Sequence, residues 1–178
     1  MLTTDIIPAA DARAVLAQSR GNALAHAGVA LLLLAGLRPG EVEALRVADY
    51  ERGGDGARLR TGALRHPRGI RIASSAAAAL DAYLATQAGV DEEDFLLPEL
   101  RTTRLVQLVR GSAAAAGVQA GVHDLRKAAV AAVLEDGAPV SHVEAYFGMS
   151  KAPGRKDLVP VRDGYDAGIA DVLEHAFA

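Results

Sequence analysis

The stretch AGLRPGEVEAL, residues 35–45, marks the point at which one buried helix ends and another begins. Residues 36–40 predict a turn, because glycine and proline interrupt regular structure. Pro39 suits the first position of a new helix, and Glu41 then lies in the first turn, where a negative charge is favoured. We therefore expect a short helix to follow directly after Arg38.

Arg38 is a candidate phosphate ligand. At this junction its guanidinium can point into a cleft lined by backbone N–H groups, and its planar fork can donate two parallel hydrogen bonds to phosphate oxygens. The alternative is a surface salt bridge with Glu41 or Glu43, which is a common role for arginine. The residue alone leaves both open.

The residues before this stretch predict two helices. Residues 11–35 are rich in alanine and leucine at helical spacing, with a break at Gly21-Asn22. The apolar run 29–35 is far shorter than the roughly 20 residues that span a bilayer, so it predicts a buried helix. We see no signal-peptide pattern at the N-terminus and expect a cytoplasmic protein with no membrane partner.

Composition predicts one compact domain over residues 1–178, since 51% of the residues are hydrophobic. The chain has no cysteine, which excludes disulfides and thiolate metal sites. Its net charge of −3 argues against a protein coated in positive charge, as many nonspecific DNA binders are. Arginines nevertheless gather between residues 57 and 80, which contain no Asp or Glu, whereas acidic residues cluster at 91–94.

The remaining pattern predicts a mainly α domain with a small antiparallel sheet, of the α+β class. Residues 58–72 predict two strands with a hairpin turn over 61–69, and Ser74 or Ser75 can cap the helix that follows. We expect four later helices, over 102–111 with Thr102 or Thr103 as cap, 123–135, 140–147 and 165–177, and a loop over 152–164.

His123 and Arg126 are a candidate acid/base and anion pair. Their i, i+3 spacing at a helix start places both side chains on one face, where they could converge on one phosphate. Imidazole can pass a proton, and arginine can neutralise charge that develops on the phosphorus centre. The alternative is a capping histidine beside a solvated arginine.

Tyr165 is a candidate nucleophile at the start of the last predicted helix. A phenol can attack phosphate when positive neighbours stabilise its oxyanion. The alternative is a tyrosine that only packs, which is the role we expect for Tyr50, Tyr83 and Tyr146.

Together these segments resemble the tyrosine recombinase, or phage integrase, family. Sequences of that family pair TGLR-x-x-E-x-x-x-L with a later H-x-L-R helix and a Gly-His or Gly-Trp before the tyrosine. Here the corresponding segments are 35–45, His123-Asp124-Leu125-Arg126 and the sequence around Gly148, in the same order and with a hairpin between the first two.

The resemblance implies the catalytic-domain fold of that family, and site-specific recombination or integration of double-stranded DNA through a 3′-phosphotyrosine, with no nucleotide cofactor or obligatory metal. It implies that Arg38 and Arg126 hold the nonbridging oxygens, that His123 accepts and donates the proton, and that Tyr165 attacks. Glu41 would orient Arg38.

The sequence departs from the family pattern at several positions. Ala63 stands where the hairpin presents a lysine, Met149 replaces the His or Trp after Gly148, and Tyr165 lies farther along the chain than usual. The N-terminal helical domain that completes a clamp around DNA is not found in the sequence. The candidate DNA-binding side chains are Arg65, His66, Arg68, Lys127 and Arg155.

These departures leave three functions open. The first is an active recombinase, and the second is a catalytically degenerate protein of the same fold that binds DNA or regulates a recombinase. The third is an interaction module without DNA, which the acidic balance favours. The family pattern also predicts a tetramer on DNA, formed when residues 169–178 dock onto a neighbouring protomer.

Overall fold

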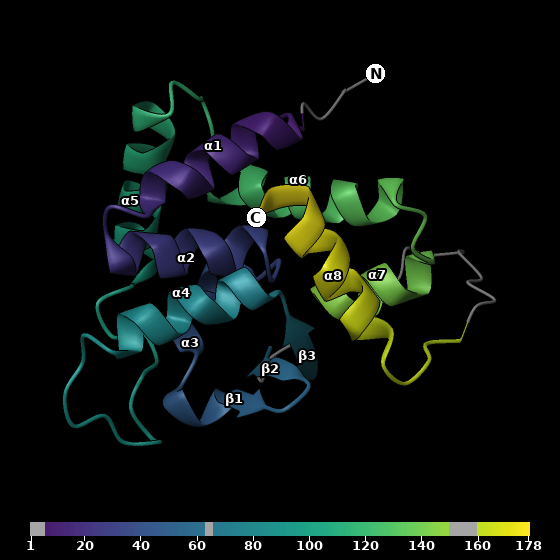
Figure 1. The fold of residues 1–178 in the computed structure, drawn as a ribbon, viewed down its shortest axis with the longest axis horizontal. Coiled ribbons are helices and arrows are strands. Elements are labelled where there is room, and N and C mark those ends of the chain that lie inside the picture. Colours follow the sequence, from purple (N-terminus) through teal and green to yellow (C-terminus); the bar gives the residue numbers. More distant parts are fainter. Residues whose placement is uncertain (1–5, 63–65, 150–159) are drawn as a thin grey trace.

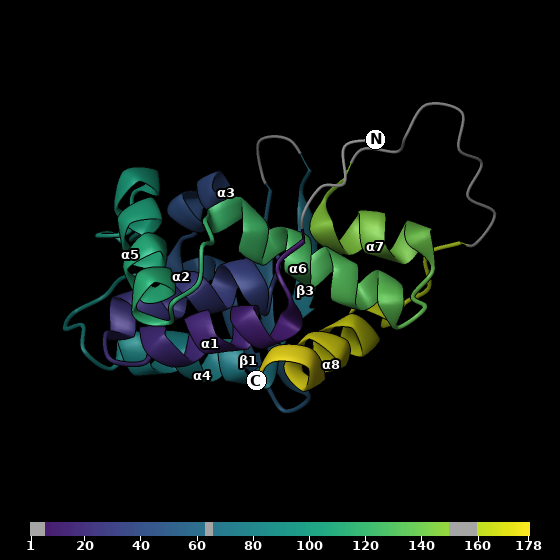
Figure 2. The same ribbon diagram turned by 90° about the horizontal axis from the view of Figure 1, so that it is seen from above.

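The structure is a computed structural model that describes residues 6–62, 66–149 and 160–178. It is mainly helical with one three-stranded antiparallel sheet, as the sequence predicts (Figures 1 and 2). The elements are α1 (Ala9–Ser19), α2 (Ala23–Leu33), α3 (Pro39–Ala44), the 3-10 turn η1 (Val47–Asp49), β1 (Tyr50–Gly53), β2 (Gly56–Thr61), β3 (Arg68–Ile72), α4 (Ser74–Leu84), α5 (Thr102–Ala115), α6 (Val122–Glu135), α7 (Val140–Phe147) and α8 (Tyr165–Phe177).

Helix α2 is the centre of the core and contacts α1, α4, α5 and α6. Its C-terminal half and the residues that follow are fully buried through Ala35, which explains the unbroken apolar run. Asn22 caps the helix, since its side chain accepts a hydrogen bond from the Ala25 amide at 3.0 Å. The two predicted helices and the break between them are confirmed.

The sheet has the order β1-β2-β3, with Leu59, Ile70 and Ile72 buried. Strand β1 was not predicted, because its side chains are exposed or half-buried and show no apolar alternation. The predicted turn was too long, since β3 already begins at Arg68. Figure 1 shows α7 and α8 beside the β3 edge of this sheet.

Two predicted helix caps were wrong. Neither Ser74 nor Ser75 caps α4. Instead the amide and hydroxyl of Ser75 both donate to the Glu174 carboxylate of α8. Helix α5 begins at Thr102 without a local side-chain cap, and its first amide donates to Glu43 of α3 at 2.9 Å. Helix α5 also ends at Ala115, four residues past the predicted end at Gly111. The start of the helix is set by a carboxylate from α3, which has no signal in the local sequence.

Helix α8 is buried against its own domain. Ile169, Leu173 and Phe177 lie in the core, and Asp166 accepts a hydrogen bond from the Arg71 amide of β3 at 2.8 Å. Asp166 also pairs with Arg58 of β2 at 3.0 Å. Within the described parts of the chain, no helix combines the length and the apolar character that crossing a membrane requires.

Candidate phosphate-binding site

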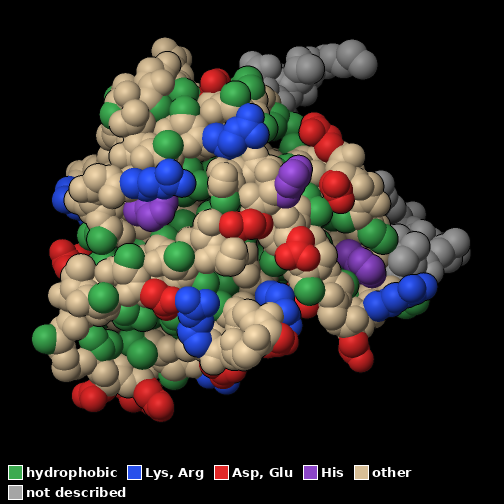
Figure 3. All heavy atoms as spheres, in the orientation of Figure 1, with side chains coloured by type: hydrophobic (Ala, Val, Ile, Leu, Met, Phe, Trp, Pro, Cys, Tyr) green, Lys and Arg blue, Asp and Glu red, His purple; other side chains and the backbone are tan. Residues whose placement is uncertain are grey.

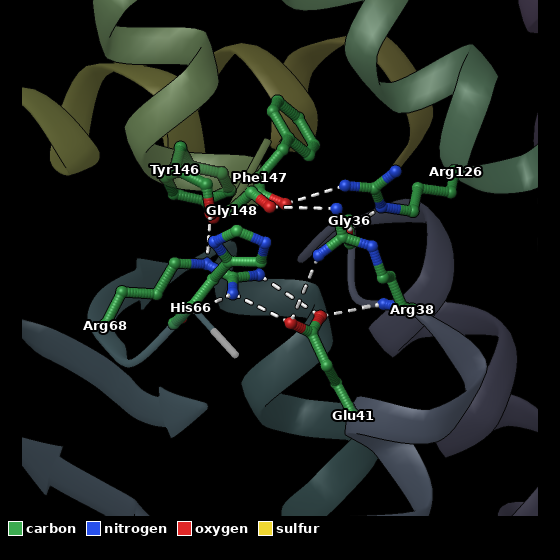
Figure 4. A network of polar contacts seen from close by, with 9 residues as sticks. All are labelled: Gly36, Arg38, Glu41, His66, Arg68, Arg126, Tyr146, Phe147 and Gly148. Carbon is green, nitrogen blue, oxygen red and sulfur yellow. Dashed lines mark hydrogen bonds and ion pairs between the residues drawn. The ribbon is translucent and has the colours of Figure 1, made fainter. Parts of the chain in front are cut away.

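Three arginines from α6, β3 and the residue before α3 meet at the C-terminal end of α7 (Figure 4). Each donates a hydrogen bond to a different one of three consecutive carbonyls: Arg68 Nε to Tyr146 at 2.7 Å, Arg126 Nη2 to Phe147 at 2.6 Å and Arg38 Nη2 to Gly148 at 2.8 Å. The last carbonyls of a helix have no partner within it, and the negative end of the helix dipole attracts cations. The end of α7 therefore gathers three positive charges.

Arg126 is fixed by two backbone carbonyls. Its Nε donates to Gly36 at 2.9 Å, in addition to the bond to Phe147, so it joins α6 to the turn before α3 and to α7. Burial, together with the positive charges of Arg38 and Arg68, lowers the pKa of Arg126 to about 10. The guanidinium stays protonated near neutral pH and lies in a region where an anion is favoured.

Arg38 is the more exposed member of the cluster. Its side chain is 38% exposed, whereas that of Arg68 is 8% exposed. Arg38 Nη1 lies 3.6 Å from Glu41 Oε1, which is an ion pair without a hydrogen bond. Among the described residues, no hydrogen bond or ion pair joins Arg38 to Glu43. The alternative of a salt bridge with Glu41 is thus met only by a long ion pair, and part of the Arg38 guanidinium faces solvent.

Glu41 is the acidic partner of the cluster. Its Oε2 accepts the Arg38 amide at 2.9 Å, which closes the start of α3, and its carboxylate accepts two hydrogen bonds from Arg68 at 2.8 and 3.1 Å. Burial by itself raises the pKa of Glu41, but the hydrogen bonds from Arg68 and the Arg38 amide outweigh it and lower the pKa. Glu41 is therefore charged at neutral pH.

Two glycines permit this close packing. Gly36 and Gly148 adopt left-handed φ angles of 64° and 60°, which side chains disfavour. A Cβ on Gly36 would lie 2.1 Å from the buried Phe147 ring, and one on Gly148 would lie 2.4 Å from Arg68 Nη1. Both carbonyls accept arginine hydrogen bonds, so these glycines bring backbone oxygens within reach of the cations.

His123 lies exposed in the first turn of α6, one turn before Arg126 and on the same side of the helix. The start of α6 is capped by Asp124, whose carboxylate accepts the Gly121 amide at 2.8 Å. His123 is therefore not the cap, and Arg126 is bound rather than solvated. No hydrogen bond between described residues involves the His123 side chain.

The Tyr165 ring packs against His142. Its ring centroid is 5.3 Å from that of His142, in the first turn of α7, whereas the arginines bind the other end of that helix. At 1.5 Å rise per residue, His142 and Phe147 are about 8 Å apart along the helix axis. Burial, and then the charge of Asp166, raise the pKa of Tyr165. The positive charges of Arg68 and Arg58 oppose this shift without outweighing it. Among described residues, no hydrogen bond joins Tyr165 to Arg38, His123 or Arg126.

The predicted DNA-binding side chains lie in different settings. Arg68 is buried and paired with Glu41, so its guanidinium does not face an exposed surface. His66 is half-buried beside the cluster, and its carbonyl accepts Arg68 Nη1 at 3.2 Å. Lys127 is exposed on α6. Arg65 and Arg155 lie outside the described residues, as does Ala63.

The part of the site that sequence reasoning missed is the bridge from Arg68 to Glu41 and to α7. No local pattern signals it, because the partners lie on β3, α3 and α7.

Met149 follows the arginine cluster in sequence. Its side chain is 38% exposed, and its amide donates a hydrogen bond to the Glu144 carbonyl. No group of three His, Cys, Asp or Glu side chains within the described ranges could hold a metal ion.

A family model described as the phage integrase family matches residues 7–152 of this sequence. The chain belongs to the phage integrase family. The match includes Arg38, His123, Arg126 and the α7 end, and it stops before Tyr165. None of the curated proteins matches the chain.

Solved recombinase structures share the fold of this phage integrase family member. The XerA recombinase matches with a TM-score of 0.72 at 18% identity, over 98% of this chain and 60% of that one. The XerH site-specific recombinase bound to difH substrate matches with a TM-score of 0.66 at 14% identity, over 84% and 50%. The catalytic core of lambda integrase matches with a TM-score of 0.61 at 14% identity, over 84% and 95%. The chain thus spans about 60% of the XerA chain and half of the XerH chain.

Proposed function

We propose that this domain acts in site-specific DNA recombination and that Arg38 and Arg126 bind the phosphate at which a strand is cut. The observation that carries the proposal is the meeting of these two guanidiniums at the end of α7, with His123 one turn before Arg126. XerH and lambda integrase, which share the fold, were solved with a difH substrate and a core site. We assign double-stranded DNA as the partner here.

In this mechanism each residue has one role. Arg38 and Arg126 donate hydrogen bonds to the nonbridging oxygens and stabilise the charge that develops on them. The Tyr165 oxygen attacks phosphorus and forms a 3′-phosphotyrosine, while the bond to the 5′ oxygen breaks and that oxygen takes a proton from water. His123 accepts the phenol proton and returns a proton in the reverse step. The proposed chemistry uses no cofactor.

Tyr165 has to leave His142 to reach that phosphate. The ring packs on His142, which lies about 8 Å along α7 from Phe147, and burial raises the pKa of its phenol. We propose that the start of α8 moves to deliver Tyr165, at the cost of the hydrogen bond between Asp166 and the Arg71 amide. Such a change costs the contacts described above, so we expect DNA binding to provide the compensating interactions.

A suicide-substrate assay tests the cleavage step. The purified chain is mixed with a pool of nicked duplexes of randomised sequence, and covalent protein–DNA adducts are separated in denaturing gels. We expect an adduct that disappears in Tyr165→Phe and persists in Tyr83→Phe, a matched buried tyrosine on α4. Failure of the wild-type chain to form an adduct with any pool member would refute strand cleavage.

A second candidate function is DNA binding without cleavage, and the anchored position of Tyr165 favours it. Under this function the chain binds duplex DNA, the affinity falls with salt, and Arg38→Gln or Arg126→Gln weakens binding. Tyr165→Phe changes nothing and no adduct forms. On the face in Figure 3, basic and acidic side chains are interspersed.

We also propose that the protomers assemble on DNA, since lambda integrase was solved as a dimer on a core site and as a tetramer on a Holliday junction. In residues 169–178, Ile169 and Leu173 are buried in their own core, so docking onto a neighbour would use the exposed residues Asp171 and His175 or release the buried ones. That the chain acts as one domain over residues 1–178, in the cytoplasm, stays a prediction from the sequence.

A further inference from the structure

We infer that Arg68 is a positioning residue: by pairing with Glu41 it keeps that carboxylate from capturing Arg38, and so leaves Arg38 able to bind an anion. The inference rests on the proposed phosphate site and adds a residue that controls it. It also replaces our expectation that Arg68 contacts DNA directly.

The distances show which arginine holds the carboxylate. Arg68 donates to both carboxylate oxygens of Glu41, at 2.8 and 3.1 Å, in the bidentate arrangement that is strongest for this pair. Arg38 Nη1 is 3.6 Å from the nearer oxygen, beyond hydrogen-bond range. The carboxylate is therefore satisfied by Arg68, although Arg38 is only one turn away from it in sequence.

Arg68 has little capacity left for a phosphate. Its Nε binds the Tyr146 carbonyl, Nη1 serves both Glu41 and the His66 carbonyl, and Nη2 binds Glu41, so four of its five N–H groups have partners. The side chain is 8% exposed, and the backbone of Gly148 packs directly against its guanidinium. Figure 4 shows Arg68 between Glu41 and the end of α7.

Removal of Arg68 would leave Glu41 largely shielded from solvent, with one nearby cation. The Glu41 side chain is 11% exposed, and an unpaired charge at such a site is costly. The guanidinium of Arg38 can relieve that cost by closing a gap of less than 1 Å to hydrogen-bond distance. It would then be turned toward Glu41 and neutralised, and the site would lose its exposed cation.

The test measures binding of inorganic phosphate by following the arginine side-chain NMR signals in a titration. We expect Arg68→Met to weaken phosphate binding about tenfold, because Glu41 then captures Arg38. The double variant Arg68→Met/Glu41→Gln should bind phosphate within about twofold of the wild-type chain, because a neutral amide no longer captures Arg38.

The matched control separates positioning from net charge. Arg68→Met/Glu43→Gln removes the same charge from the same helix, but Glu43 binds the start of α5 rather than the arginine cluster. We expect this variant to remain about tenfold weakened. Equal recovery in both double variants, or no recovery in either, would overturn the inference.

Two further measurements keep the result interpretable. If Arg68→Met does not fold, Arg68→Lys replaces it, because lysine keeps the charge but cannot form the bidentate pair. Arg68→Lys should weaken phosphate binding by less than Arg68→Met/Glu43→Gln does. A wild-type chain whose Arg38 signal does not respond to phosphate refutes the proposed site itself. A responding wild-type chain with an unaffected Arg68→Met variant refutes only the role of Arg68.

Discussion

Gly36 offers the sharpest test of how this fold builds its site, because it lies in the turn between the end of α2 and Arg38. Its φ is +64°, and an added Cβ would lie 2.1 and 2.4 Å from two atoms of the Phe147 ring. We therefore expect Gly36→Ala to destabilise the domain by two separate mechanisms, one in the backbone and one in the core.

The magnitude follows from those two mechanisms. A left-handed conformation costs a non-glycine residue about 1–2 kcal/mol. Forcing a methyl group into a well-packed core costs about 1–3 kcal/mol. The sum is about 2–5 kcal/mol, and for a domain of this size it lowers Tm by roughly 4–20 °C. Displacement of Phe147 should also disturb Arg126, which binds the carbonyls of both residues.

The assay is thermal and urea unfolding followed by circular dichroism, with Gly168→Ala as the matched control. Gly168 lies within α8, and nothing lies within 4 Å of an added Cβ there. Alanine is favoured over glycine in a helix by about 1 kcal/mol, so this variant should be stabilised. If Gly36→Ala unfolds at the wild-type temperature, the account of the turn is wrong.

Two further predictions concern titration. Glu41 has a pKa lowered from 4.5, so its pairing stabilises the fold above that pH and the contribution is lost as pH falls through the lowered value. The free energy of unfolding should therefore fall more steeply below pH 4.5 in the wild-type chain than in Glu41→Gln, and parallel curves would contradict this. All four tyrosines have pKa values raised above 10.0, so tyrosinate absorbance should appear only above pH 10. A phenol that titrates below pH 9 and disappears in Tyr165→Phe would mean that Tyr165 faces the arginines.

Much of the helical framework could be predicted from the sequence because its signals are local. Asn22 caps α2, Pro39 opens α3, and glycines follow several helices, so α1, α2, α3, α6, α7 and α8 lie where the residue pattern places them. Strand β1 was not predicted because its residues are exposed or half-buried at a sheet edge, where apolar alternation is not required.

The candidate site could be predicted only in part, for a physical reason. Arg38, Glu41 and the pair on α6 belong to short motifs whose spacing is visible in the chain. The role of Arg68 depends on a carboxylate and a carbonyl far away in sequence, and the position of Tyr165 depends on the contact between α7 and α8. Such contacts come from packing between elements and leave no local pattern.

The measurement that tests the central claim most directly is an NMR titration of the ¹⁵N-labelled chain with duplex DNA, read at the arginine side-chain signals. We predict saturable changes at Arg38 and Arg126, with Arg68 still bound to Glu41 and its signal unchanged. Unperturbed Arg38 and Arg126 signals in a chain that binds the duplex would contradict the phosphate site.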